Sequence, residues 1–392
     1  STPQLKYFFD TLGIAEAEWM PRCNATYKTG ITFAGWARRP GFERYFHPFP
    51  SQLDANSAPG FYLNCAARRR GIDVCADPNR FFLNAHLADK KLGPTPAHSF
   101  PFRVSYGYHF DAYLVGAFLR EHATGKGVRH IEGRVAKVDV DAAGDVAALL
   151  TDDGRRIEAD FFVDSSGFRA VIAQEALGAR FRSFKENLFN DSAVVMPTPR
   201  DPAGVNSQTI ATAMSAGWAW DIPLTSRTGN GYVYSSDFIS ADAAERELRA
   251  KTGLEDSDVA ARHLKMKVGR IETAWTGNCL AVGLSQGFVE PLEATALHVV
   301  QETVERFIEA FEQGGFAPTR RDAFNAEIAA RFEGIRDYIV CHYKISYRPE
   351  TEYWRACAGI EALSDSLRRI LECWMRGADL SHERDQQRIA QY

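Results

Sequence analysis

Two tryptophans stand one residue apart in the stretch from Gly217 to Pro223, which reads GWAWDIP. Residues i and i+2 share a face in a strand but not in a helix, so this spacing predicts a strand. Trp218 and Trp220 then lie side by side on one surface, and Pro223 fixes the end of the strand. The stretch alone leaves open whether that surface faces a core or a cavity.

Composition sets the broad class of the chain. Its 392 residues suggest roughly two or three domains at about 150 residues each. Hydrophobic residues make up 45% and charged residues 24%, so enough apolar material is present for a large core. The net charge of -4, with acidic and basic residues interspersed, argues against nucleic acid or an anionic membrane as a partner. No apolar run approaches the roughly 20 residues of a spanning helix.

The cysteines indicate the redox compartment. They are odd in number, dispersed and without a CxxC pair, which favours a reducing cytoplasm over a disulfide framework or a zinc site. The seven positions are Cys23, Cys65, Cys75, Cys279, Cys341, Cys357 and Cys373. We therefore expect a cytoplasmic protein without a metal.

Alternating and helical patterns predict the order of elements. Residues 24–36 read as one strand, and the Pro-, Phe- and His-rich residues 40–59 read as a loop. Residues 109–124 have helical spacing, and a β-meander follows them. The run DFFVDSSGF, residues 160–168, predicts a buried parallel strand whose end opens onto a ligand crevice.

The last quarter of the chain is mostly helical in pattern. Helices are expected over 292–313, 320–343 and 361–377. The sequence thus predicts an α/β protein with a first part, 1–290, and a largely helical second part, 291–392. We expect the two parts to pack as one unit.

Lys28 is the first candidate for chemistry. In strand register it shares a face with the small residues Thr26, Gly30 and Thr32. Such a lysine either reaches solvent or points into a polar cavity, and the bland alternative is an ordinary solvated lysine.

Glu293 is the second candidate, in the run GFVEPLEATALHVV. It falls at the start of an apolar helical run, where the positive helix end favours an anion. Thr295 and Ala296 lie in the same first turn, and their backbone N–H groups lack partners within the helix. That turn could bind a small anion, although a carboxylate there is also ordinary structure.

Aromatic residues and glycine turns give weaker signals. His47 and Phe49 alternate around a proline in YFHPFP, where a flat aromatic ligand could stack if the segment is more than a packed loop. The turns 165–167 and 283–285 would let a cofactor approach the backbone closely. The sequence has no useful GxGxxG and no HExxH, so a zinc protease is not signalled.

In combination these segments resemble a known family. The order of the lysine strand, HPF, HFDAYLVGAFLREHA, DFFVDSSGFR, GWAWDIP and GFVEPLEAT is similar to the flavin-dependent halogenases, specifically their tryptophan/indole group. W-x-W-x-I-P is the specific marker, and the resemblance runs from Ser1 to about Trp374. It implies the FAD-binding, flavin-monooxygenase-like fold, with a Rossmann-type sheet and a β-meander.

The resemblance also implies an activity and a set of site residues. Reduced FAD, O2 and chloride or bromide yield hypohalous acid, which passes through a tunnel to an electron-rich aromatic substrate. Lys28 matches the catalytic lysine, which hydrogen-bonds that acid or becomes a haloamine. Glu293 matches the catalytic glutamate, and the halide binds at the amides of Thr295 and Ala296.

Further positions match the family residue by residue. His47 and Phe49 would sandwich the substrate ring. The two tryptophans would be a barrier that keeps substrate from the flavin. Flavin contacts match Val135, Leu284 and Leu297. The family takes FADH2 from a separate flavin reductase; whether this chain forms a homodimer is left open.

Three departures from the family pattern qualify these expectations. The phosphate-binding Gly-rich turn and the C-terminal segment that grips the tryptophan backbone do not match any part of the chain, and Ala296 stands where glycine is usual. From these we expect weak FAD binding by the chain as given, and indole as a better substrate than free tryptophan. The alternatives are a flavin-dependent aromatic hydroxylase and a truncated, non-catalytic chain that binds aromatics.

Overall fold

The computed structural model describes residues 1–346, 348–378 and 380. Contacts divide the chain into two compact units, and each is described by itself. The first comprises Ser1–Phe118, Phe189–Lys265 and the stretch from Asp337 onward, and the second comprises Leu119–Leu188 and the stretch 266–336. The expected division into 1–290 and 291–392 stays a prediction.

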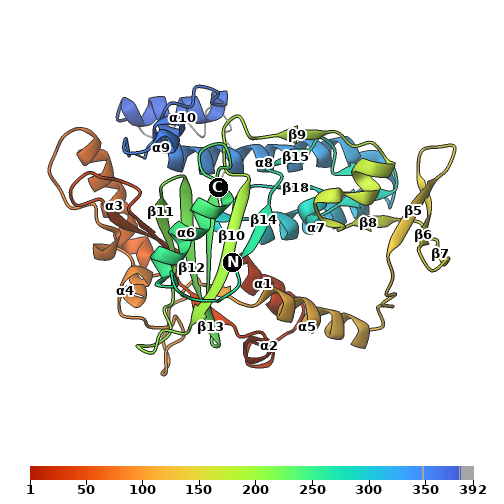
Figure 1. Ribbon diagram of the computed structural model, residues 1–392, viewed down its shortest axis with the longest axis horizontal. Helices are drawn as coiled ribbons and strands as arrows, with labels where there is room; N and C mark the ends of the chain where they lie inside the picture. Colours follow the sequence, from red (N-terminus) through yellow and green to blue (C-terminus); the bar gives the residue numbers. More distant parts are fainter. Residues whose placement is uncertain (347, 379, 381–392) are drawn as a thin grey trace. The chain divides into compact units, whose positions relative to one another are not determined.

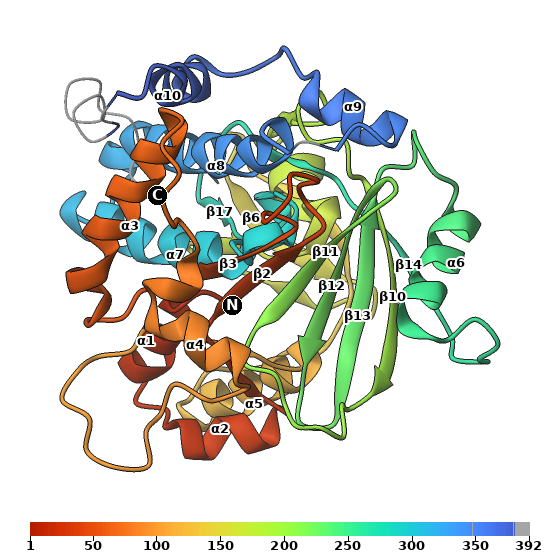
Figure 2. The ribbon, with the colours of Figure 1, turned by 90° about the vertical axis from the view of Figure 1, so that its left-hand side faces the viewer.

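A seven-stranded sheet forms the centre of the first unit (Figure 2). Its order is β14-β10-β13-β12-β11-β2-β3, and every neighbouring pair is antiparallel except β11 with β2. The strands are β14 (Arg262–Lys265), β10 (Ser192–Pro199), β13 (Arg227–Tyr234), β12 (Gly217–Pro223), β11 (Thr209–Met214), β2 (Gly30–Ala34) and β3 (Arg44–Pro48). The predicted GWAWDIP strand is β12, a central strand.

Helix α6 (Ala241–Thr252) packs beside β10 and β13 of this sheet (Figure 1). Its Ala244 and Leu248 are buried against Val194, Tyr232 and other apolar side chains. The Ser240 side chain accepts a hydrogen bond from the Ala243 N–H at the helix start, and a left-handed glycine follows the last turn. The sequence thus delimits this helix at both ends.

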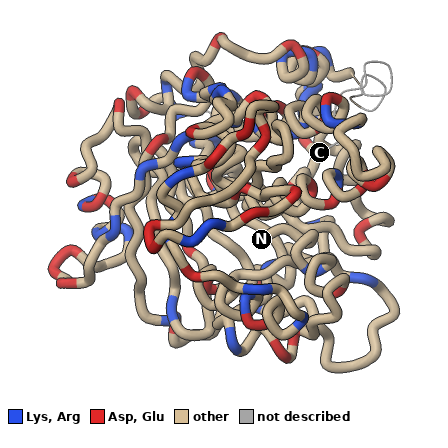
Figure 3. The backbone as a smooth tube through the Cα atoms, turned by 90° about the vertical axis from the view of Figure 1, so that its right-hand side faces the viewer, with Lys and Arg blue, Asp and Glu red and all other residues tan. Residues whose placement is uncertain are grey.

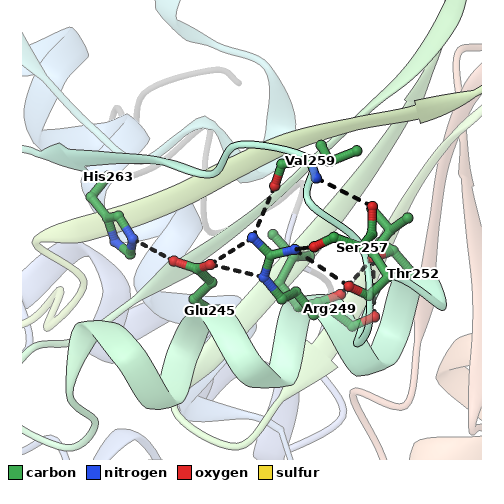
Figure 4. A network of polar contacts seen from close by, with 8 residues as sticks. Glu245, Arg249, Thr252, Ser257, Val259 and His263 are labelled. Carbon is green, nitrogen blue, oxygen red and sulfur yellow. Dashed lines mark hydrogen bonds and ion pairs between the residues drawn. The ribbon is translucent and has the colours of Figure 1, made fainter.

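A polar network fixes α6 to the chain that follows it (Figure 4). Arg249 Nε donates to Glu245 Oε1 at 2.8 Å, and its Nη atoms donate to the carbonyls of Leu254, Ser257 and Val259. His263 Nε2 lies 2.8 Å from Glu245 Oε2. The hydrogen bond from His263, and next that from Arg249, lower the pKa of Glu245.

The predicted single strand over 24–36 is wrong. It is two strands, β1 (Thr26–Lys28), which pairs with β4 (Gly107–His109), and β2, which belongs to the large sheet. The break falls at Thr29, whose N–H donates to Ser207 O at 2.7 Å and whose carbonyl accepts from Phe49 N at 2.9 Å. These two bonds take Thr29 out of both ladders, and a local pattern cannot show that.

The predicted loop over 40–59 is also wrong. It contains β3 and the start of α3 (Asp54–Arg69), because pairing with β2 overrides the poor strand propensity of proline at an edge. The first unit further holds α1 (Gln4–Thr11), α2 (Glu16–Arg22), α4 (Leu83–Asp89), α9 (Glu352–Ala358) and α10 (Asp365–Met375). The expected helix over 361–377 is confirmed as α10, and α9 was not predicted.

The second unit contains the predicted meander. Strands β5 (Val135–Val140), β6 (Val146–Thr151) and β7 (Arg156–Ile157) pair in order and antiparallel. The predicted parallel strand is β8 (Phe162–Asp164), which pairs in parallel with β17 (Cys279–Ala281). Two short turns follow these strand ends: η3 (Val171–Ala176) and η4 (Gly283–Ser285).

Two long helices account for the predicted helical patterns downstream. Helix α7 (Ala296–Gln313) belongs to the second unit, and α8 (Arg321–Lys344) crosses the boundary between the units. The remaining strands of the second unit are β9 (Phe181–Ser183), β15 (Gly269–Ile271), β16 (Trp275–Thr276) and β18 (Gly287–Phe288). The long expected helices are therefore confirmed, within a few residues at their ends.

Along the described part of the trace, basic and acidic positions are interspersed (Figure 3). In the described part of the chain, no helix combines the length and the apolar character that crossing a membrane requires. The described residues also contain no group of three or more His, Cys, Asp or Glu that could hold a metal ion.

Candidate functional site

Lys28 is a buried lysine, with 2% of its surface exposed. It ends β1 opposite Gly107, and its Nζ lies 5.6 Å from the centroid of the Phe49 ring. An ammonium over an aromatic face is attracted by the ring quadrupole. The alternative of a solvated surface lysine is therefore wrong, because the side chain is enclosed next to an aromatic ring.

His47 lies on the strand that the sequence did not reveal, and Phe49 follows the end of that strand. His47 lies on β3 opposite Ile31, and its Nδ1 is 3.4 Å from the hydroxyl of Tyr338. Phe49 is buried, and Asn84 Nδ2 donates to its carbonyl at 2.5 Å. The structure thus brings Lys28 next to Phe49 and places Tyr338 beside His47.

A hydrogen-bond chain runs from the end of the tryptophan strand through β1 and β4 to β11. Thr26 Oγ1 donates to the Pro223 carbonyl at 2.6 Å, so toward His109 Nδ1, at 3.1 Å, it can only accept. His109 therefore carries its proton on Nδ1. Its Nε2 then accepts from Thr209 Oγ1 at 2.9 Å.

His109 is held neutral by its surroundings. It is 4% exposed. Burial, and next the charge of Lys28, keep its pKa well below the ordinary value of 6.5. The cationic form would also lack an acceptor at Nε2, where a hydroxyl now donates. Sequence reasoning missed this residue because its partners lie 83 and 100 residues away.

Trp218 and Trp220 stand side by side as the spacing predicted. Their ring centroids are 6.0 Å apart with an interplanar angle of 57°. Trp218 is buried, and Trp220 is half-buried opposite Gly231. A Cβ at Gly231 would lie 2.1 Å from Cζ2 of Trp220, so the indole occupies the space of a side chain there.

The second unit has an apolar pocket of about 230 Å³. It brings together four predicted site residues: Leu284, Thr295, Ala296 and Leu297. Leu284 and Leu297 are 41% and 39% exposed, so part of their apolar surface is open. The described lining does not include Val135, a half-buried residue at the start of β5.

Glu293 lies in a 3-10 turn rather than in the predicted apolar helix. The turn, Pro291–Glu293, ends at Ala294, whose φ of 57° is left-handed, and Thr295 then caps α7. Glu293 is 5% exposed, so its carboxylate is withdrawn from bulk water. The amides of Thr295 and Ala296 do stand at the start of an 18-residue helix, as expected.

This pocket fits the groups that the sequence implies. Leucine side chains and a turn with glycines at 283 and 287 suit one face of a flat ring. Amides at the positive end of a long helix suit a small anion. The residues present therefore fit a flavin ring and a halide, although neither group belongs to the structure described.

The sequence comparisons agree on one family. A family model described as tryptophan halogenase matches residues 1–388. The chain is 36% identical over 393 residues to a tryptophan 6-halogenase of Streptomyces toxytricini, covering 94% of this chain and 74% of that protein. It is also 36% identical over 389 residues to a tryptophan 7-halogenase of Lentzea aerocolonigenes, covering 94% and 72%.

Solved structures agree with the sequence comparisons. The crystal structure of the Streptomyces toxytricini enzyme matches with a TM-score of 0.86 at 37% identity, covering 95% of this chain and 76% of that one. A flavin-dependent halogenase from Xanthomonas campestris matches with a TM-score of 0.85 at 36% identity, covering 95% and 74%. The predicted α/β class is confirmed. The chain is an enzyme and belongs to the tryptophan halogenase family of flavin-dependent halogenases.

Proposed function

We propose that the protein chlorinates or brominates the ring of an indole. The observation that carries the proposal is the enclosed ammonium of Lys28 next to the Phe49 ring. The ring of Phe49 beside it, and the pair of His47 and Tyr338 in the same unit, are aromatic, which suits a flat ring more than an amino-acid backbone. Indole is therefore proposed ahead of free tryptophan.

Lys28 has the role of holding the electrophilic halogen. Reduced FAD, with O2 and halide, supplies hypohalous acid when it is bound. An ammonium is a donor to the oxygen of that acid, and a buried donor is stronger because water does not compete for it. His47 and Phe49 would hold the substrate ring beside the lysine.

Glu293 has the role of stabilising the cationic ring or accepting its proton. A carboxylate withdrawn from water, as this one is, acts strongly on a nearby developing positive charge. The amides of Thr295 and Ala296 would bind the halide, and Leu284 and Leu297 would contact the flavin ring. Val135 is retained as a proposed flavin contact, on the resemblance alone.

Trp218 and Trp220 would act as a wall that separates substrate from flavin. What supports this role is their mutual packing and the close fit of Trp220 over Gly231, which leaves the rings little freedom. Their bulk and rigidity are the useful properties, and neither ring takes part in the reaction.

Partners and compartment complete the proposal. The tryptophan halogenase family implies a separate flavin reductase as the source of FADH2. A cytoplasmic location is proposed on the free thiols of Cys23, Cys65, Cys75, Cys279 and Cys341, which a reducing compartment preserves. A homodimer stays a prediction.

The test uses indole, bromide and a flavin reductase, with mass spectrometry of the product. Lys28→Met keeps side-chain length and removes the charge, so bromoindole should vanish while hypohalous acid still reaches a chemical trap. Glu293→Gln should lower the rate by about 100-fold, the effect of losing one general base. Lys90→Ala and Glu305→Gln, at exposed positions, are the matched controls.

Three results would contradict the proposal. Bromoindole from Lys28→Met at the parental rate would exclude the role of the lysine. Hydroxyindole without bromoindole from the parent would indicate an aromatic hydroxylase instead. A higher kcat/KM for free tryptophan than for indole would exclude the proposed substrate preference.

A further inference from the structure

Asp164 is a buried carboxylate, 1% exposed, at the end of the parallel strand β8. Its Oδ1 accepts hydrogen bonds from the Ser166 N–H at 2.9 Å, from Ser166 Oγ at 2.6 Å and from Ser285 Oγ at 3.1 Å. Its Oδ2 accepts from the N–H groups of Ile172 and Ala173, at 2.9 and 2.8 Å. All five donors belong to the second unit.

These bonds join three segments, the last of which is distant in the sequence from the other two. Ser166 follows β8, Ile172 and Ala173 begin η3, and Ser285 ends η4. The backbone adds one more link, because Val282 N donates to the Asp164 carbonyl at 2.9 Å. Asp164 is thus the point where the end of β8 and the two following turns meet.

One of the three segments is a wall of the apolar pocket. Gly283 and Leu284 of η4 line it, and Ser285, the last residue of η4, is fully buried behind them. The hydroxyl of Ser285 donates to Asp164, and neither residue is part of the pocket lining. The position of Leu284 in the pocket therefore depends on the hydrogen bond between Ser285 and Asp164, which lie outside the pocket lining.

The carboxylate keeps its charge at neutral pH. Burial alone would raise the pKa of Asp164, but the hydrogen bonds from Ser166 and from the amides of Ala173, Ser166 and Ile172 outweigh burial and lower it. Charge-assisted bonds are about twice as strong as neutral ones, so an ionised acceptor holds the turns more firmly.

We infer that Asp164 is a positioning residue for flavin binding: through Ser285 it fixes the turn 283–285 against which the flavin ring packs. The inference rests on the proposed function, which assigns this pocket to the flavin. Asp164 is not part of the pocket lining. It acts by keeping Leu284 and the backbone of the turn in place before the ring arrives, which lowers the ordering cost of binding.

Ser285→Ala is the sharpest test, because it removes one of the five bonds and leaves the other four. The probe is riboflavin, which lacks phosphates and so reports on the ring pocket alone. We expect its Kd to rise about tenfold, the size of one hydrogen bond to a charged group. The parental circular dichroism spectrum should be kept.

Thr151→Val is the matched control. Thr151 Oγ1 donates to Asp153 Oδ1 at 2.5 Å in the same unit, and neither residue lines the pocket. This variant should bind riboflavin within about twofold of the parent, because it loses a similar bond elsewhere. Asp164→Asn is the second variant: its amide would face the N–H groups of Ile172 and Ala173, so it should lose more affinity than Ser285→Ala.

The outcomes separate this inference from the proposed function. Parental affinity in Ser285→Ala, or an equal loss in Thr151→Val, would overturn the positioning role while bromoindole formation by the parent still stands. A parent that binds no riboflavin would overturn the inference together with the assignment of the pocket. A tenfold loss confined to Ser285→Ala and Asp164→Asn would support it.

Discussion

Aromatic side chains in this protein are placed by residues on neighbouring elements. Trp220 is placed by Gly231 on the neighbouring strand, and Phe49 by Asn84, which donates to its carbonyl. Neither supporting residue carries chemistry of its own. Each is nevertheless a position where a small change should move a large ring.

Gly231→Ala should displace the Trp220 ring. The new methyl would lie 2.1 Å from the indole, closer than any real contact, so we expect a loss of roughly 1–3 kcal/mol in the free energy of unfolding. Tryptophan fluorescence should shift in the same variant. Denaturant unfolding gives the energy and the emission maximum gives the ring environment.

Gly229→Ala is the control for this prediction. A Cβ there would lie 3.8 Å from the carbonyl of Ile222, an ordinary contact, so stability and fluorescence should stay near the parental values. Equal effects of the two substitutions would show that strand glycines in general, and not the indole over position 231, set the result.

His109 should make the protein sensitive to mild acid. Its pKa in the folded protein is lowered below 6.5, so as pH falls through that value the unfolded chain takes up a proton that the folded chain does not. The free energy of unfolding should therefore fall between pH 7 and pH 5, by at most about 1.4 kcal/mol per pH unit from this group.

His109→Asn isolates that contribution. Asparagine keeps a donor for Thr26 and does not titrate, so the stability difference between parent and variant should shrink as pH falls. The measurement is urea unfolding of both proteins from pH 7.5 to 5.5. A difference that stays constant across that range would show that His109 is protonated alike in both states.

Elements differ in how far their sequences determine them. Helix α6 is predictable because its cap, its apolar face and its final glycine are local. The strand over 24–36 was mispredicted because its break depends on Ser207 and on Phe49, which are remote from Thr29 in the sequence. Strand β3 was missed because an edge strand tolerates proline where local patterns predict a loop.

The network at the end of α6 gives an element-scale prediction (Figure 4). Glu245→Gln should lower the free energy of unfolding by about 1 kcal/mol at pH 7, because Arg249 and His263 lose a charged acceptor. The lowered pKa of Glu245 means that its stabilisation is present above pH 4.5 and is lost as pH falls through the folded value.

The control for Glu245 lies in the loop after the helix. Glu255 is exposed, so Glu255→Gln should leave the unfolding free energy unchanged at either pH. Thermal unfolding of the two variants at pH 7 and pH 4 measures the comparison. If Glu245→Gln destabilises the protein as much at pH 4 as at pH 7, the charge of Glu245 is not the source of its stabilising effect.

At the scale of the whole molecule, motifs revealed more of the site than periodicity did. The order of short motifs identified the family, and four of the matched residues do line one pocket. Tyr338 and His109 escaped notice because their partners come from remote parts of the chain, and so does Ser285, the donor that links Asp164 to the pocket turn. Their importance is visible only as hydrogen bonds between segments.

The whole enzyme should depend on an external source of reduced flavin. With FAD, NADH, bromide and indole but no reductase, we expect no bromoindole, because the tryptophan halogenase family implies a separate flavin reductase. Chemically reduced FAD in air should restore the product. Product formation from NADH and FAD alone, measured by mass spectrometry with reductase-free protein, would contradict this dependence.

The break at Thr29 also bears on insertions and deletions. Lys28 is the last residue of β1 and Gly30 is the first residue of β2, and these strands belong to different sheets. The register of β1 is fixed by the pairing of Lys28 with Gly107, and that of β2 by the pairing of Gly30 with Pro48. One extra residue here would turn the lysine to the opposite face or pull a strand out of register. Length changes among natural variants should therefore avoid residues 26–34 and gather in stretches such as 91–103, which have neither helix nor strand.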